Sequence, residues 1–207
     1  MSKIREVVNY CDEQFHPEYQ EDYDNAGFLL GRADDECTGV LTSIDLTPAV
    51  IAEAKEYGLN LIITHHPFIF GGLKRITTDS ETGRMVYDLI ESGIAVYAAH
   101  TNLDNLRYGV NGVLAERLGL VDTQILRPMQ GINEVGAGMV GNLTQTMDVD
   151  VFLQMLKQRL GLSQLRCSKL CKERVSRVAI CGGAGTFLIN DAVNAGADIY
   201  VTADVKY

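Results

Sequence analysis

The stretch GVLTSIDLTPAVIAEAKEYGLNLIITHHP, residues 39–67, decides the fold. It predicts a strand over 39–45, a helix that begins at Pro48 and ends at a glycine, and a second strand over 59–64. Proline favours the start of a helix because it lacks a backbone donor, and glycine favours the end because it tolerates positive φ. The stretch is therefore a βαβ unit, which predicts two parallel strands joined by a right-handed crossover.

Strands alternate with helices along most of the chain. Helices are predicted over 4–15, 83–93, 111–120, 148–161 and 188–196. Residues 94–104 predict a strand that runs into a polar loop, 175–185 a strand followed by a glycine loop, and 197–204 a strand. This alternation predicts an α/β fold with mostly parallel strands. The glycine-rich stretch 128–148 interrupts it, so we place a first α/β lobe over 1–127 and a second over 128–207.

The composition excludes several classes of protein. Hydrophobic residues make up 46% of the 207 residues and charged residues 22%, as in a folded globular protein. No apolar run approaches the roughly 18 residues of a membrane span, and the first 20 residues do not resemble a signal peptide. The net charge of -9 disfavours nucleic acid as a partner. Five scattered cysteines are an odd number, which favours reduced thiols. We therefore expect a cytoplasmic protein with no membrane partner.

Three of the predicted strand ends carry unusual polar residues, at 64–66, 100–104 and 202–204. In parallel α/β sheets, ligands bind beyond the carboxyl ends of the strands, so these three strand ends can converge on one site.

The histidine doublet His65-His66 is the most informative part of that pattern. Successive side chains of a regular strand point to opposite faces, so both imidazoles can face a common site only if the strand ends between them. Pro67 favours such an end. The doublet can then bind two divalent ions roughly 3.5 to 4 Å apart, with Asp104 as the carboxylate that bridges them. Imidazole and carboxylate together suit zinc, iron, manganese or nickel, and the spacing does not distinguish among them.

Other candidate residues have a structural reading beside the functional one. A single histidine at a strand end, such as His100, is more often a hydrogen-bonded structural residue than a ligand. The CGGAG loop, residues 181–185, can expose amides to an anion, but it lacks the lysine of a P-loop and fits a tight turn equally well. Asp45 can fix neighbouring loops, although capping the helix that begins near Pro48 is the favoured reading.

Four motifs together resemble one family: DNAGFLLG (24–31), ITHHPFIF (63–70), YAAHTNLDN (97–105) and CGGAG with YVTADVKY near the end. The chain resembles the Ngg-interacting-factor-three-like family, whose members are often labelled GTP cyclohydrolase I type 2 homologs. The resemblance covers nearly the whole chain in the right order.

The resemblance implies two α/β lobes with a dinuclear metal site between them, at the C-terminal ends of the strands, in subunits assembled as a homohexamer. It assigns His65, His66 and Asp104 as metal ligands and places His100 beside the site. The family's remaining ligands are a histidine directly after the motif that ends here at Tyr207, and a glutamate a few residues further on. We therefore expect that the given sequence is shortened before the last ligands and the last helix of the second lobe.

Three functions are compatible with these features. The first is a metal-dependent hydrolase acting on a small molecule, with His100 as the residue that transfers protons, since imidazole titrates near neutral pH. The second is a metal-binding or metal-delivery protein without turnover. The third is a regulatory scaffold whose assembly is its function, and here replacing His65 and His66 leaves activity in cells intact.

Overall fold

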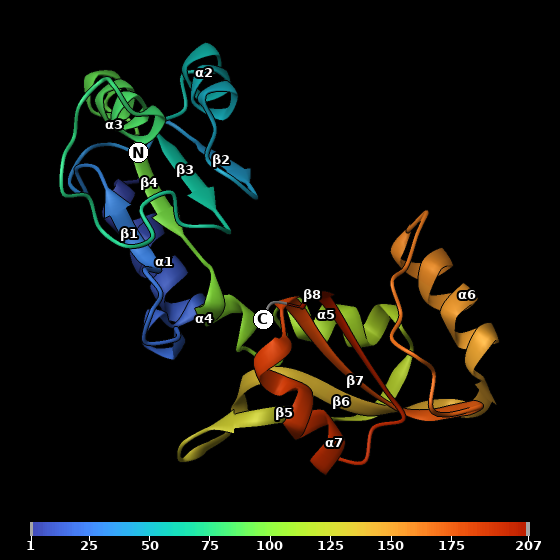
Figure 1. The fold of residues 1–207 in the computed structure, drawn as a ribbon. Helices are drawn as coiled ribbons and strands as arrows, with labels where there is room; N and C mark the ends of the chain where they lie inside the picture. The colour runs from blue at the N-terminus through green and yellow to red at the C-terminus, as the bar shows by residue number, and fades with distance from the viewer. Residues whose placement is uncertain (1, 206–207) are drawn as a thin grey trace. The chain divides into compact units, whose positions relative to one another are not determined.

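The computed structural model describes residues 2–205 and contains two compact units, the first ending at Leu103 and the second beginning at Asp104 (Figure 1). Each unit contains one four-stranded sheet. The α/β class and the two-lobe organisation predicted from the sequence are confirmed. The last two residues of the C-terminal motif, 206 and 207, lie outside the described residues.

The sheet of the first unit has the strand order β1-β4-β3-β2. Its strands are β1 (Gly27–Leu30), β2 (Val40–Ser43), β3 (Leu61–Thr64) and β4 (Ala95–Ala98). β2, β3 and β4 are parallel, as the βαβ pattern predicts, and β1 is antiparallel to β4. The register pairs Ser43 with Thr64 and Thr64 with Ala98, so the three parallel strands end at the same level.

Helices pack on both faces of this sheet. The helices of this unit are α1 (Ile4–Phe15), η1 (Pro17–Tyr19), α2 (Pro48–Glu56), α3 (Glu81–Ser92) and α4 (Thr101–Asp104), and α1, α2 and α3 are the ones that cover the sheet. α4 ends at the first residue of the second unit. Because side chains alternate along a strand, Leu61 and Tyr97 pack with apolar residues of α1. Their neighbours Ile62 and Val96 pack with α2 and α3 on the other face. Both faces of β3 and β4 are therefore apolar, as is typical of central parallel strands.

The ends of the helices follow the local signals in the sequence. α1 spans the predicted residues 4–15, and α2 begins at Pro48. Thr47 caps α2, since its hydroxyl accepts a hydrogen bond from the amide of Val50 at 3.3 Å. α3 ends at Gly93, whose φ of 66° is accessible to glycine at little cost. No helix within residues 2–205 combines the length and the apolar composition needed to cross a membrane.

The second unit has the strand order β5-β6-β7-β8. Its elements are α5 (Val110–Arg117), β5 (Leu120–Met129), β6 (Ile132–Asp148), α6 (Val149–Leu160), β7 (Arg174–Ala184), η2 (Thr186–Leu188), α7 (Ile189–Asn194) and β8 (Ile199–Asp204). β7 and β8 are parallel, whereas β5–β6 and β6–β7 are antiparallel. This sheet is therefore mixed, with a long β5–β6 hairpin that the alternating pattern does not predict.

The glycine-rich stretch at which the sequence places the lobe junction is the strand β6. Residues 127 and 128 belong to β5, and the observed boundary lies earlier, between Leu103 and Asp104. A Cβ on Gly136 would lie 2.1 Å from the carbonyl oxygen of Arg127, and one on Gly138 would lie 2.9 Å from that of Ile180. Glycine is needed at these positions because the neighbouring strands approach too closely for side chains. Glycine-rich sequence is also typical of turns, and for this reason the stretch resembles a junction between lobes.

Candidate metal site

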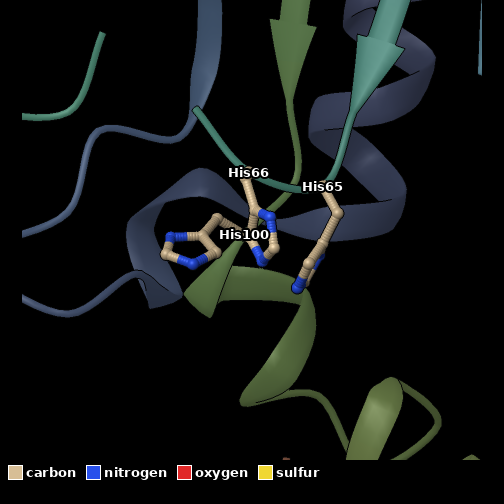
Figure 2. Close-up of side chains that lie close together, drawn as sticks. All are labelled: His65, His66 and His100. Atoms are coloured by element: carbon tan, nitrogen blue, oxygen red, sulfur yellow. The ribbon is translucent and has the colours of Figure 1, made fainter. Parts of the chain in front are cut away.

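Three histidines gather at the carboxyl ends of β3 and β4. β3 ends at Thr64, directly before His65 and His66, and β4 ends at Ala98, two residues before His100. Because Thr64 and Ala98 are paired in the parallel sheet, the segments that follow them leave the sheet side by side. Figure 2 shows the three imidazoles grouped beyond the two strands.

The doublet lies just beyond the regular strand, where backbone pairing still fixes its position. The amide of His65 donates to the carbonyl of Ser43 at 3.2 Å, and that of His66 donates to Ile44 at 2.9 Å. β3 therefore ends at Thr64, as the predicted strand over 59–64 does, and both histidines lie beyond its end. This departure from the alternating geometry lets both imidazoles lie on the same side of the site.

The imidazoles are close enough to share a metal ion. The ring centroids are 4.9 Å apart for His65 and His66, 5.3 Å for His65 and His100, and 5.5 Å for His66 and His100. One ring nitrogen from each lies within 4.8 Å of those of the other two. Three convergent imidazoles form a donor set suited to divalent transition metals such as zinc, iron or nickel.

The two histidines of the doublet are oriented through their Nδ1 atoms. His65 Nδ1 lies 2.7 Å from the carbonyl oxygen of Ala99, which can only accept, so this nitrogen carries the proton. His66 Nδ1 lies 2.7 Å from Asp45 Oδ1. In a neutral imidazole with a protonated Nδ1, the lone pair is on Nε2. Metal-binding histidines in proteins commonly have this arrangement, in which an oxygen acceptor fixes the tautomer and the ring orientation.

His100 is oriented in the same way by a buried carboxylate. Its Nδ1 lies 2.8 Å from Asp24 Oδ1, and the Asp24 side chain is 0% exposed. Asp24 also accepts from the amide of Asn25 at 2.7 Å, from the amide of Thr101 at 3.0 Å and from the Thr101 hydroxyl. Burial alone would raise the pKa of Asp24, but the hydrogen bonds from His100, Thr101 and Asn25 outweigh it and hold the pKa well below its usual range. Asp24 is therefore an ionised acceptor.

Asp45 binds His66 and does not cap a helix. The capping side chain of α2 is Thr47, and Asp45 Oδ1 is instead the acceptor for His66 Nδ1. The favoured sequence reading of Asp45 is thus wrong, because the helix begins three residues later at Pro48 and a nearer residue supplies the cap. Asp24 has no predicted role of its own, and its only signal in the sequence is its place in the DNAGFLLG motif.

Asp104, the predicted bridging ligand, ends α4 four residues after His100. It is half-buried, and its carbonyl oxygen accepts a hydrogen bond from the side-chain amide of Asn111 at 3.0 Å. The cluster of convergent ring nitrogens consists of the three histidines. The role of Asp104 as a ligand therefore stays a prediction.

The CGGAG loop in the second unit is held by side chains of β8. The Thr202 hydroxyl accepts from the amide of Gly185 at 3.0 Å and donates to the carbonyl of Gly183 at 2.9 Å. The Tyr200 hydroxyl donates to the carbonyl of Gly185 at 2.7 Å. Residues 181–184 are the end of β7, where the register with β8 shifts between Cys181 and Ala184, so most of the predicted loop is an irregular strand end. The convergence of this strand end with the histidines stays a prediction.

Comparisons with known proteins agree on one family over nearly the whole chain. The Duf34/NIF3 (NGG1p interacting factor 3) family matches residues 2–207. A GTP cyclohydrolase 1 type 2 homolog from Clostridium perfringens is 36% identical over 205 residues, which are 99% of this chain and 78% of that protein.

Solved structures give the same result. A hypothetical protein of Staphylococcus aureus superposes with a TM-score of 0.89 at 30% identity, over 99% of this chain and 80% of that one. A Bacillus cereus protein related to NIF3 superposes with a TM-score of 0.90 at 25% identity, over 100% of this chain and 83% of that one.

Proposed function

The chain belongs to the Duf34/NIF3 (NGG1p interacting factor 3) family, and from this premise we propose that it is a metal-dependent hydrolase with a dinuclear centre. One observation carries the proposal. Each of three clustered imidazoles has its Nδ1 against an oxygen acceptor, which leaves Nε2 as the atom that binds metal in the doublet and transfers a proton in His100.

His65 and His66 are the proposed protein ligands in the first unit, together with Asp104. Ala99 and Asp45 hold the two rings of the doublet in the coordinating tautomer. His66 is 49% exposed on its side chain, so ions and small molecules can reach this end of the cluster. Two divalent ions, when bound, would lower the pKa of a water molecule and polarise the bond under attack.

His100 is the proposed proton-transfer residue. Its ring lies 5.3 Å from that of His65 and 5.5 Å from that of His66, within reach of a molecule bound at the doublet. Asp24 holds His100 Nδ1, so Nε2 is the atom that takes up and returns a proton at the reacting group. The anchoring carboxylate also stabilises the imidazolium that forms during transfer.

The cluster also favours a second function, that of a protein that binds and delivers metal without turnover. The ring nitrogens of all three histidines lie within 4.8 Å of one another, a spacing that allows one ion to be held by three imidazoles. In that arrangement His100 is a ligand. Metal content then falls in His100→Ala, whereas a proton-transfer role leaves metal content unchanged.

Elemental mass spectrometry of the metal-loaded chain and its histidine variants tests the proposal. We expect His65→Ala and His66→Ala to lose metal. His16→Ala is the matched control, because His16 directly follows α1 and its Nδ1 pairs with Glu18 at 3.1 Å, outside the cluster. Full metal content in both doublet variants would contradict the proposed ligands.

Turnover is tested separately with a panel of 4-nitrophenyl phosphate and carboxylate esters. We expect hydrolysis that requires added metal and is lost in His100→Gln, which keeps a polar side chain but cannot transfer a proton as imidazole does. Because a relative from Clostridium perfringens is named GTP cyclohydrolase 1 type 2 homolog, GTP is a further substrate to include. Metal binding without hydrolysis of any of these compounds would favour the metal-delivery function.

A further inference from the structure

Two exposed aromatic rings extend the histidine cluster on one side. The ring of Phe70 lies 6.0 Å from that of His100, with the ring planes at 75°. The ring of Tyr23 lies 6.2 Å from that of Phe70. Both distances are within the range of favourable aromatic pairs. The two aromatic side chains thus continue from His100 as a short row, which we call the aromatic step (Tyr23 and Phe70).

The aromatic step is on the surface and not in the core. Phe70 is 49% exposed and Tyr23 is 61% exposed. Single exposed aromatic residues are common, but here two pair with each other, and Phe70 also packs against the histidine cluster. Their exposed ring surface is apolar and is available to a ligand that reaches the cluster.

A segment of three residues, 23–25, contacts both the aromatic step and the histidine cluster. Tyr23 supplies a ring, and the next residue, Asp24, holds His100. The following residue, Asn25, donates from its side-chain amide to the carbonyl oxygen of Ile69 at 2.6 Å, directly before Phe70. The segment therefore fixes both the imidazole and the backbone that carries the phenyl ring. Two contact points at a fixed distance, the metal site and the apolar ring surface, can orient a ligand.

We propose that the aromatic step is a ring-binding subsite, so that the ligand of this site carries a planar aromatic or heteroaromatic ring beside the group that reaches the metal. This inference rests on the proposed metal function and specifies its ligand class. A planar ring gains contact area and a favourable quadrupole interaction on Phe70 and Tyr23, whereas an aliphatic group of similar size gains contact area alone. The subsite therefore selects among compounds that share the same metal-binding group.

Two hydroxamates separate the ring from the metal-binding group. Benzohydroxamate and acetohydroxamate have the same chelating atoms, and the first carries a phenyl ring where the second carries a methyl group. Their dissociation constants are measured by calorimetry on the zinc-loaded chain, and the ratio of the two constants isolates the ring contact. The variants are Phe70→Leu and Tyr23→Leu, with Phe70→Tyr as the variant that keeps a ring. Tyr10→Leu is the matched control, because Tyr10 is also 61% exposed in the same unit and lies on α1.

We expect the preference for benzohydroxamate to fall about fivefold in Phe70→Leu, the effect of one aromatic pair, and to fall in Tyr23→Leu. Phe70→Tyr and Tyr10→Leu keep the wild-type ratio. An unchanged ratio in both leucine variants overturns the ring-binding subsite and leaves the metal site standing.

Failure of the metal function gives a different result. His65→Ala weakens both hydroxamates together when the metal site is real, because both share the chelating group. If neither hydroxamate binds the zinc-loaded wild-type chain, the metal function and the ring-binding subsite are both overturned.

Discussion

Replacing Asp24 with asparagine should weaken folding and, through His100, turnover. The change preserves the shape of the side chain but removes its charge and turns one acceptor oxygen into an NH₂ donor. Asp24 is fully buried and accepts four hydrogen bonds, from the Asn25 amide, His100 Nδ1, the Thr101 amide and the Thr101 hydroxyl. If the amide oxygen of the new asparagine keeps Asn25 and His100, its NH₂ group faces the Thr101 amide, which cannot accept.

The expected magnitude follows from those contacts. Leaving the Thr101 amide unsatisfied in a buried position costs about 1–3 kcal/mol, and the remaining bonds lose their charge-assisted strength. We expect Asp24→Asn to lower the free energy of unfolding by about 2–4 kcal/mol. Because a proton-transferring imidazole must be fixed in orientation, turnover of the 4-nitrophenyl esters should also fall, by about 10- to 100-fold, while zinc affinity stays close to the wild-type value.

Asp45→Asn is the matched control. Asp45 is 63% exposed on its side chain, and its Oδ1 lies 2.7 Å from His66 Nδ1. We expect a change in unfolding free energy below about 1 kcal/mol and a loss of zinc affinity of about tenfold or less. The assays are urea unfolding of the metal-free chain at pH 7 and zinc competition with a chelator. Equal stability losses in the two variants, or wild-type stability in Asp24→Asn, would refute the reasoning.

Three further predictions concern stability and assembly. Burial raises the pKa of the Cys11 thiol to about 11, and the negative charge of Asp12 contributes a smaller part of this increase. The unfolded chain therefore loses the thiol proton at a lower pH than the folded chain does. The contribution of this thiol to the free energy of unfolding is complete below about pH 8.5 and is lost as the pH rises toward 11. In urea titrations with reductant, the difference in unfolding free energy between wild type and Cys11→Ala should therefore shrink between these two pH values. Thr47→Ala removes the cap of α2 and should cost about 1 kcal/mol in the same assay, with Thr47→Ser restoring it. Light scattering should give the mass of a homohexamer, and a monomer mass at all concentrations would contradict that assembly.

Elements with strong local signals could be predicted from the sequence. Proline, glycine and apolar periodicity locate α2 and the parallel strands β2 and β3, because these signals act over a few neighbouring residues. The βαβ unit then fixes the place of the histidine doublet, since ligands of such sheets lie beyond the strand ends. The hairpin β5–β6 has no comparable signal, because its glycines serve close strand packing.

The anchors of the histidines could not be predicted in the same way. Asp24 lies 76 residues before His100 in the chain, and Asp45 lies 21 residues before His66. Acidic residues are common on loops, so a carboxylate that orients an imidazole resembles any other until the fold brings the two together. The aromatic step depends on the same folding event, because Tyr23 and Phe70 come from two separate loops of the first unit.

Anomalous diffraction from crystals of the metal-loaded chain, recorded at the absorption edge of the bound metal, tests the central claim most directly. The account predicts peaks about 2.0–2.1 Å from Nε2 of His65 and His66, with each Nδ1 still bound to its oxygen acceptor. The absence of peaks at the histidine cluster, or peaks at bonding distance from Nδ1, would contradict the account.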